Sequence, residues 1–298
     1  MNLRLPTLIF ILCTWTSFFT GCNTHTNNVE SKRIDSLIEI QKLNNQCIQI
    51  KFGADAITAI NSKKGIVIID AGISTELTSR YRRIIENQFP GNDFAYLINS
   101  HFHPDHIGGN GVFSESRIVG HSNCLREITE EPDNKSRSGN LSKIVAEYDI
   151  LLQTSEQGTK EWDEIFTQKI RYQKAYIDAM NSIPYVEPDI TFSDSLIIDM
   201  SDVTLELFYF GKLHSDSDIL IYVPQMSILF TGDLFFRYGK TSFNETSVTD
   251  KEKWQQAIHW IEKRMSNIDR IIEGHGQILS TDDLKSFITK IKNESQQG

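Results

Sequence analysis

One short segment restricts the fold of this chain more than any other, because it places metal-capable side chains directly after an apolar run. Residues 94–98 predict a strand that leads straight into residues 101–106. Four side chains of that second segment can bind a metal: His101, His103, Asp105 and His106. On an extended backbone, residues two apart point the same way, whereas the turn at Pro104 gives His106 another direction. One loop can therefore serve two adjacent ions, with imidazoles that suit zinc and a carboxylate that adds charge.

The same arrangement, a polar residue directly after an apolar strand, recurs three times later in the chain. A predicted strand at 203–210 precedes His214, a strand at 227–230 precedes Asp233, and a strand at 268–272 precedes His275. A single His after a strand is more often an ordinary loop residue. Four such segments in one chain instead predict that these side chains meet in one metal site.

The rest of the pattern predicts strands, then helices, then strands, then helices. A hairpin at 57–60 and 66–69 ends at Asp70, and Thr75 can cap the helix that follows. Helical spacing of apolar residues predicts a helical insertion at about 125–185 and further helices at about 250–265 and from Thr281. This order predicts sheets covered by helices.

Composition supports one large soluble domain and excludes a nucleic-acid binder. The chain has 298 residues, of which 39% are hydrophobic and 23% charged. Lys and Arg number 30 against 39 Asp and Glu, so the net charge of -9 leaves no basic face for nucleic acid. The 4 Cys are too few for a disulfide scaffold. Cys47 and Cys124 either pair or remain two buried thiols.

The N-terminal segment is similar to the lipobox signal of bacterial lipoproteins. Residues 5–19 carry no charge, follow Arg4, and are too few to cross a ~30 Å hydrocarbon core. Small residues then precede Cys22, although Phe19 stands where such signals usually have Leu. The resemblance implies a signal peptide at 1–21, a membrane anchor through lipid on Cys22, a tether at 22–45 and a location in the bacterial cell envelope facing the periplasm. An ordinary cleaved signal or a short membrane anchor is the alternative.

Taken together, the metal-capable residues resemble the metallo-β-lactamase superfamily. The resemblance rests on His-Phe-His-Pro-Asp-His at 101–106, on His214, on Thr-Gly-Asp ending at Asp233, and on Gly-His-Gly around His275. Asp70, before Ala-Gly, also fits. The resemblance covers about residues 46–298 and implies one α/β hydrolase domain. Its fold would be a four-layer αβ/βα sandwich with the metals at one edge, interrupted by the helical insertion.

The resemblance also implies a role for each ligand. Two zinc ions would share a water whose pKa falls towards ~7, giving a hydroxide that attacks at neutral pH. Asp105 would orient that water and take part in proton transfer. The implied ligands are His101, His103 and His214 for the first ion, Asp105, His106 and His275 for the second, and Asp233 as a bridge. His121, which ends a predicted strand near the site, is a further candidate for substrate contact.

The activity that this implies is hydrolysis of a carbonyl bond, in an ester, lactone or lactam, of a small molecule. A true β-lactamase is the first alternative, because residues 214–218 are similar to the corresponding stretch of those enzymes. The best-known zinc β-lactamases, however, carry Cys in place of Asp233, lack a His at the position of His106, and have a substrate-binding Lys where Phe236 stands. Arg237 could bind the substrate carboxylate instead.

Two further questions stay open in the sequence. An iron-dependent redox member of the superfamily is a second alternative: His103 argues against the di-iron type, in which Glu replaces a His, but not against a mononuclear iron site. The insertion carries aromatic residues that either line a substrate pocket or pack the insertion on the core: Trp162, Phe166, Tyr172 and Tyr176. The sequence does not indicate an oligomeric state.

Overall fold

The computed structural model describes residues 20–235 and 248–295, in two compact units that divide after Ser36. Helix α1 (Thr20–Leu37) forms the described part of the first unit and ends one residue beyond it, and its residues include the predicted cleavage site and most of the predicted tether. Most of the predicted signal peptide lies outside the described residues. Among the described helices, none combines the length and apolar character needed to cross a membrane.

The second unit begins at Leu37 rather than at the predicted residue 46. The difference arises from strand β1 (Glu39–Lys42), which pairs antiparallel with β2 (Cys47–Phe52) at the edge of a sheet. All four residues of β1 are exposed, so the segment has no alternation of apolar and polar residues that would reveal it.

The first sheet has seven strands in the order of the sequence, β1 to β7. The others are β3 (Asp55–Ser62), β4 (Gly65–Ile69), β5 (Phe94–Ile98), β6 (Arg117–His121) and β7 (Ile190–Phe192). Pairing is antiparallel up to β4 and parallel from β4 to β7. Helix α2 (Thr75–Gln88) buries Leu77, Tyr81 and Ile85, and its N-cap is Ser74 rather than the predicted Thr75.

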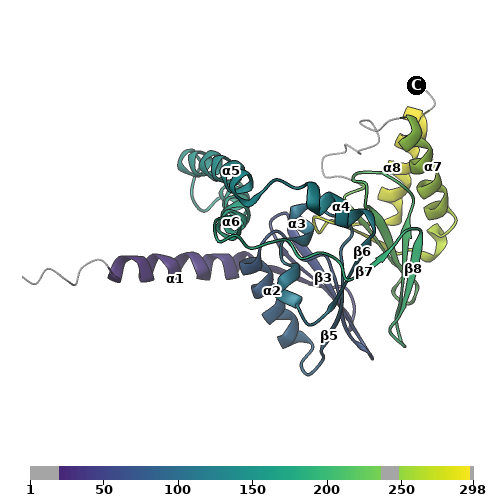
Figure 1. Ribbon diagram of the computed structural model, residues 1–298, viewed down its shortest axis with the longest axis horizontal. Helices are drawn as coiled ribbons and strands as arrows, with labels where there is room; N and C mark the ends of the chain where they lie inside the picture. Colours follow the sequence, from purple (N-terminus) through teal and green to yellow (C-terminus); the bar gives the residue numbers. More distant parts are fainter. Residues whose placement is uncertain (1–19, 236–247, 296–298) are drawn as a thin grey trace, which may run out of the picture. The chain divides into compact units, whose positions relative to one another are not determined.

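The second sheet has six strands in the order β13-β12-β11-β10-β9-β8. They are β8 (Ser195–Asp199), β9 (Thr204–Tyr209), β10 (Ile219–Val223), β11 (Ile228–Gly232), β12 (Arg270–Glu273) and β13 (Ile278–Leu279). One apolar cluster lies between the sheets, with Ile60, Val67 and Ile98 from the first sheet and Leu205, Ile221 and Phe230 from the second. A second cluster packs helices α7 (Val248–Glu262) and α8 (Thr281–Ser295) on the outer face. Figure 1 shows this order of layers, which confirms the predicted αβ/βα sandwich.

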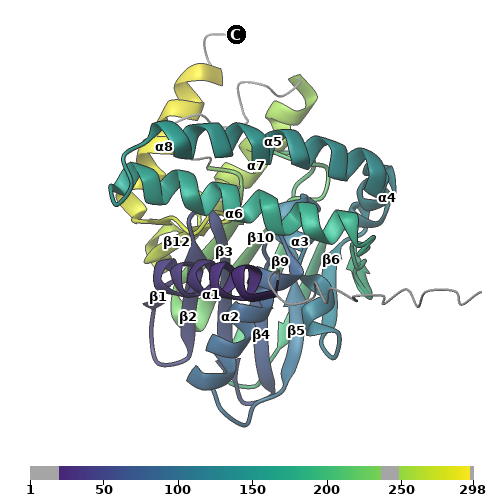
Figure 2. The same cartoon turned by 90° about the vertical axis from the view of Figure 1, so that its left-hand side faces the viewer.

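Three helices form the predicted insertion between the two sheets in the sequence. They are α4 (Asn123–Glu130), α5 (Asn134–Thr154) and α6 (Lys160–Met180), and Figure 2 shows α5 and α6 side by side. Trp162 stacks on Phe166, and Tyr172 stacks on Tyr148, with ring centroids 5.2 and 5.7 Å apart. These stacks favour the packing role for the aromatic residues of the insertion over a substrate-binding one.

Candidate metal centre

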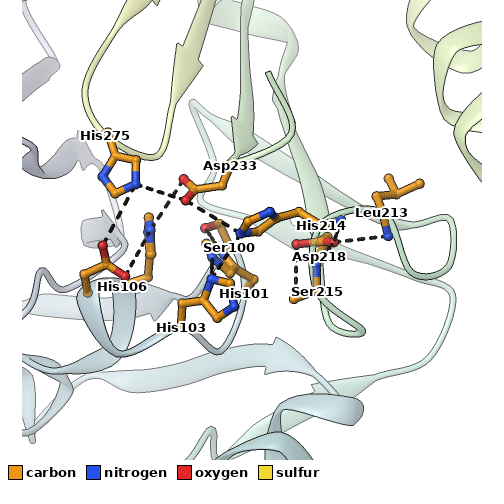
Figure 3. Close-up of polar contacts among 12 residues, drawn as sticks. Ser100, His101, His103, His106, Leu213, His214, Ser215, Asp218, Asp233 and His275 are labelled. Carbon is orange, nitrogen blue, oxygen red and sulfur yellow. Dashed lines mark hydrogen bonds and ion pairs between the residues drawn. The ribbon is translucent and has the colours of Figure 1, made fainter. Parts of the chain in front are cut away.

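The predicted ligands come together because four strands end near one edge of the sandwich. Strand β5 leads to the short helix α3 (Pro104–Ile107), which carries Asp105 and His106 and follows His101 and His103. Strands β9, β11 and β12 lead to the three later ligands, which are His214, Asp233 and His275. Figure 3 shows the side chains of His101, His103, His106, His214, Asp233 and His275 turned toward one another, and Asp105 lies with His106 and His275. All seven predicted ligands therefore lie in one cluster, which we call the metal cluster.

Three imidazoles form the first half of the metal cluster. His103 Nδ1 lies 3.0 Å from His101 Nε2 and 3.1 Å from His214 Nε2. His101 is fully buried. A neutral imidazole carries a proton on only one ring nitrogen, so three facing nitrogens cannot all be satisfied by hydrogen bonds to one another. A divalent cation between them would use all three lone pairs at once.

The second half of the metal cluster contains Asp105, His106 and His275, and Asp233 stands between the halves. Asp233 Oδ1 is 3.5 Å from His106 Nε2, and its Oδ2 is 3.0 Å from His275 Nε2 and 3.9 Å from His214 Nε2. The ligand atoms of each group lie within 4.8 Å of one another: His101, His103, His214 and Asp233 in one, and Asp105, His106 and His275 in the other. This placement suits the bridging role that the sequence suggests for Asp233.

Two buried atoms of the metal cluster have no hydrogen-bond partner. They are Nε2 of His106 and Oδ1 of Asp233, on side chains that are 1% and 4% exposed. Buried polar atoms in folded proteins are nearly always paired, so such orphans call for a missing partner. Imidazole nitrogen and carboxylate oxygen are the ligands that zinc accepts. The residues present therefore fit a metal centre.

A second layer of hydrogen bonds fixes the ligands. Asp70 accepts hydrogen bonds from the backbone N–H and hydroxyl of Ser100 at 2.7 and 2.8 Å, and its Oδ2 lies 2.9 Å from His106 Nδ1. Asp70 has a φ of 59°, a left-handed conformation that costs energy for a residue other than glycine. The tight turn therefore delivers a carboxylate to His106, and this leaves His106 Nε2 free to bind a metal.

The later ligands are held by backbone contacts. His275 Nδ1 lies 2.7 Å from the carbonyl oxygen of Ala54, so its Nε2 faces the metal cluster. Asp218 accepts hydrogen bonds from the backbone N–H groups of His214 and Ser215, both at 2.6 Å. The Asp218 carboxylate thereby closes the loop that carries His214, a role that the sequence analysis did not assign to it.

Burial and charge act differently on the two halves of the metal cluster. Burial lowers the pKa of His103 to about 4 and also lowers the pKa of His214, so both imidazoles are neutral at pH 7. In the second half, burial also acts to lower the pKa of His106. The negative charges of Asp233 and Asp70 outweigh burial, so the pKa of His106 is raised. The hydrogen bond with Asp233 likewise raises the pKa of His275.

Metal binding by the second half is therefore expected to release protons. The raised pKa values of His106 and His275 favour the protonated forms in the metal-free chain, whereas a metal ligand must be neutral, so metal affinity should rise with increasing pH. Calorimetric titration with Zn²⁺ in two buffers of different ionisation enthalpy measures the proton release. H259Q, which changes an exposed His of α7, is the matched control and should release the same number. Binding without proton release would contradict the charge states described here.

The other predicted contacts have different outcomes. Arg237 lies outside the described residues. His121 is buried, with Nε2 3.0 Å from the carbonyl oxygen of Ser193 and its ring stacked on Tyr209 at 3.6 Å. These partners favour a structural role for His121, and its contact with substrate stays a prediction. Cys47 and Cys124 are both buried and free, so they do not pair.

One residue next to the metal cluster gave no signal in the sequence. Arg171 of α6 is buried, and its Nη2 lies 3.3 Å from Asp105 Oδ2 although the two residues are 66 positions apart. Its Nε lies 3.9 Å from Asp55 Oδ1. A charge within a helical pattern normally indicates a solvated face, so only the packing of the insertion reveals this contact.

Two mixed sheets stacked face to face bring histidines and carboxylates together at one edge, an arrangement that suits a metallo-hydrolase. The family model of the metallo-beta-lactamase superfamily matches residues 52–275, and the chain belongs to that superfamily. Similar proteins include the metallo-beta-lactamase type 2 of Bacillus cereus, 22% identical over 219 residues, and that of Elizabethkingia meningoseptica, 20% identical over 263. The alignments cover 74% and 86% of this chain, and 66% and 83% of those proteins. The Bacillus match thus spans slightly less than two-thirds of that protein.

Solved structures show the same fold. A metallo-beta-lactamase from Pontibacter korlensis superposes with a TM-score of 0.55 at 18% identity, over 86% of this chain and 99% of its own. A stereoselective inverting sec-alkylsulfatase from Pseudomonas sp. superposes with a TM-score of 0.60 at 17% identity. That match covers 88% of this chain and 42% of the sulfatase. At these identities the likeness concerns the fold, which evidently carries more than one hydrolytic activity.

Proposed function

We propose that the protein holds two zinc ions and hydrolyses a carbonyl bond, in an ester, lactone or lactam, of a small molecule. The observation that carries the proposal is the metal cluster, in which Asp233 belongs to the first group of ligand atoms and also faces His106 and His275 of the second. The buried imidazole of His101 and the partly buried imidazoles of His103 and His214 would hold the first ion. Asp105, His106 and His275 would hold the second. When bound, the ions would activate water and polarise the scissile carbonyl.

Among the described ligands of the second half, Asp105 is the one best placed to move a proton. Its side chain is 28% exposed, against 1% for His106 and 15% for His275, so it is the second-half ligand most open to an incoming molecule. Burial favours its neutral form, but His106 and His275 outweigh burial and lower the pKa of Asp105. The carboxylate is therefore ionised at neutral pH, and can accept a proton from water and pass it to a leaving group.

A hydrolysis panel tests the proposal directly. Nitrocefin, lactones, carboxylic esters, thiolesters, aryl phosphates and alkyl sulfates are offered to the protein with and without chelator. We expect turnover of a carbonyl substrate that chelator abolishes and Zn²⁺ restores, and that D105A lowers by at least about 100-fold while H259Q does not. Hydrolysis confined to phosphates or sulfates, or activity that survives chelation, would overturn the proposal. One iron and no zinc in protein purified without added metal would favour the redox alternative.

A true β-lactamase is the second candidate, and the names of the similar curated proteins favour it. Two features of this chain weigh against it. Asp233 stands where Cys is expected, and Phe236, which lies outside the described residues, stands where those enzymes carry the Lys that binds the substrate carboxylate. Chelator-sensitive turnover of nitrocefin that exceeds turnover of simple esters and lactones would move this candidate ahead.

We also propose that the mature protein is anchored in the bacterial cell envelope by lipid on Cys22, with the hydrolase domain facing the periplasm. The apolar run at 5–19 and the small residues before Cys22 support this proposal. Metabolic labelling with a radioactive fatty acid tests it: the wild-type chain should be labelled and found with membranes, whereas C22S should be neither. Labelling of C22S would contradict the anchor.

A further inference from the structure

Arg171 is a buried cation placed directly behind the metal cluster. Only 3% of its side chain is exposed, and its charged partners are carboxylates, Asp105 at 3.3 Å and Asp55 at 3.9 Å. Its Nη1 donates to Gln168 Oε1 at 2.7 Å, and its Nε has no hydrogen-bond partner. Removing a guanidinium from water is costly, so its position depends on these charged partners. A residue that served only to attach the insertion would not need this arrangement.

Asp55 fixes one side of the Arg171 guanidinium. Its carboxylate is fully buried and accepts hydrogen bonds from Ile73 N at 2.9 Å and from the Tyr81 hydroxyl at 2.8 Å. A Cβ at Gly72 would lie only 2.8 Å from Asp55 Oδ2, so the backbone packs closely around this carboxylate. Asp55 is therefore a rigid counter-charge, and Asp105 is the partner of Arg171 that retains some freedom to move.

The Asp105 carboxylate faces both Arg171 and the second half of the metal cluster. Its Oδ2 is 3.3 Å from Arg171 Nη2 and 3.9 Å from His275 Nε2, while its Oδ1 is 3.9 Å from His106 Nε2. Since the Asp105 side chain is partly exposed, it could otherwise rotate toward solvent. The contact with Arg171 restrains the orientation in which both oxygens face His106 and His275.

We propose that Arg171 is a positioning residue that orients Asp105 for the second metal ion, so that the helical insertion contributes to metal affinity. This inference rests on the proposed metal centre and extends it to α6. Charged groups that orient metal ligands typically change metal affinity 10–100-fold when removed. The effect should be confined to the second ion, because no contact of Arg171 reaches the imidazoles of His101, His103 or His214 in the described structure.

Lys174 provides a matched control one turn further along α6. Its Nζ lies 3.0 Å from Glu76 Oε2 of α2, and its side chain is 9% exposed. Like Arg171, it is a buried cation that joins the insertion to the core, but Glu76 lies outside the metal cluster. A substitution at Lys174 therefore reports what weakened attachment of the insertion does by itself.

The experiment compares R171M, R171K and K174M in the full-length protein by competition with a chromophoric chelator, which gives the affinity for each equivalent of Zn²⁺. We expect R171M to weaken the second equivalent by about 10–100-fold and to leave the first within about threefold. R171K keeps the buried charge and should fold even if R171M does not. It should still lose about tenfold, because an ammonium cannot reproduce the planar fork of Arg. K174M should bind both equivalents as the wild type does.

Unchanged or tighter binding of the second equivalent by both Arg171 variants would overturn the inference. An equal loss in K174M would do the same, because the effect would then arise from attachment of the insertion. Failure of the proposed function has a different signature. A wild-type chain that binds two ions but hydrolyses no carbonyl substrate contradicts that function, while the comparison of affinities still decides the role of Arg171.

Discussion

Replacing Asp233 with asparagine is expected to remove hydrolase activity and metal binding together, the largest effect of any isosteric change in this chain. Among the described carboxylates, Asp233 is the one within 4 Å of imidazoles in both halves of the metal cluster, through Oδ1 toward His106 and Oδ2 toward His275 and His214. Asparagine keeps the shape but offers one neutral oxygen and an N–H₂ group, which cannot bind a metal. We expect the affinity for both ions to fall by more than about 100-fold, beyond the range typical of outer-shell changes.

Metal content by atomic emission and kcat/KM on the best substrate of the panel measure this effect. D282N is the matched control, because it makes the same chemical change at an exposed aspartate of α8 whose partner is Lys285. It should keep both metal and activity. Should D233N retain two ions and activity within tenfold of wild type, Asp233 would not bridge the two halves. In that case the hydrolytic mechanism would need another arrangement of ligands.

Most of the metal cluster could be predicted from the sequence because each ligand lies close in sequence to the strand that positions it. His101, His103 and His106 lie within six positions, directly after β5, and each later ligand follows its own apolar strand. Strand ends that meet at one edge of stacked sheets then bring the ligands together whatever the details of packing. The fold class was predictable for the same reason, since alternation and helical spacing are properties of short windows.

The residues that the sequence did not reveal depend on contacts between distant segments. The helical pattern alone indicates that Arg171 is a surface charge of α6. Only the packing of the insertion against the core places Arg171 beside Asp105. The sequence does not distinguish Asp218 from the other polar residues of its loop, because nothing in it shows that the loop closes around the Asp218 carboxylate. Strand β1 was missed because its side chains are all exposed and its pairing with β2 is purely a backbone interaction.

The second large effect is expected at Gly274, which precedes His275. A Cβ built on Gly274 would collide with Asp233 Oδ1 and would lie 2.6 Å from Cε1 of His106. The backbone at Gly274 is held in place, since Gly274 N donates a hydrogen bond to the carbonyl oxygen of Gly232 at 2.8 Å. A single methyl group must therefore displace Asp233 or His106, and these carry the two unpartnered atoms that the metal centre requires. G274A should lose the second ion and at least about 100-fold in kcat/KM, because a ligand, not merely its support, is displaced.

This loss should occur without general unfolding, because Gly274 lacks the positive φ that would strain any other residue. Thermal unfolding in the presence of chelator tests this point: G274A should melt within a few degrees of metal-free wild type. G139A is the matched control, since Gly139 lies in α5 and no atom stands within 4 Å of its Cβ position. Alanine there should raise helix stability by up to about 1 kcal/mol and leave metal binding unchanged. If G274A kept its second ion while G139A behaved as expected, Asp233 and His106 would have room to move, and the site would not depend on their present positions.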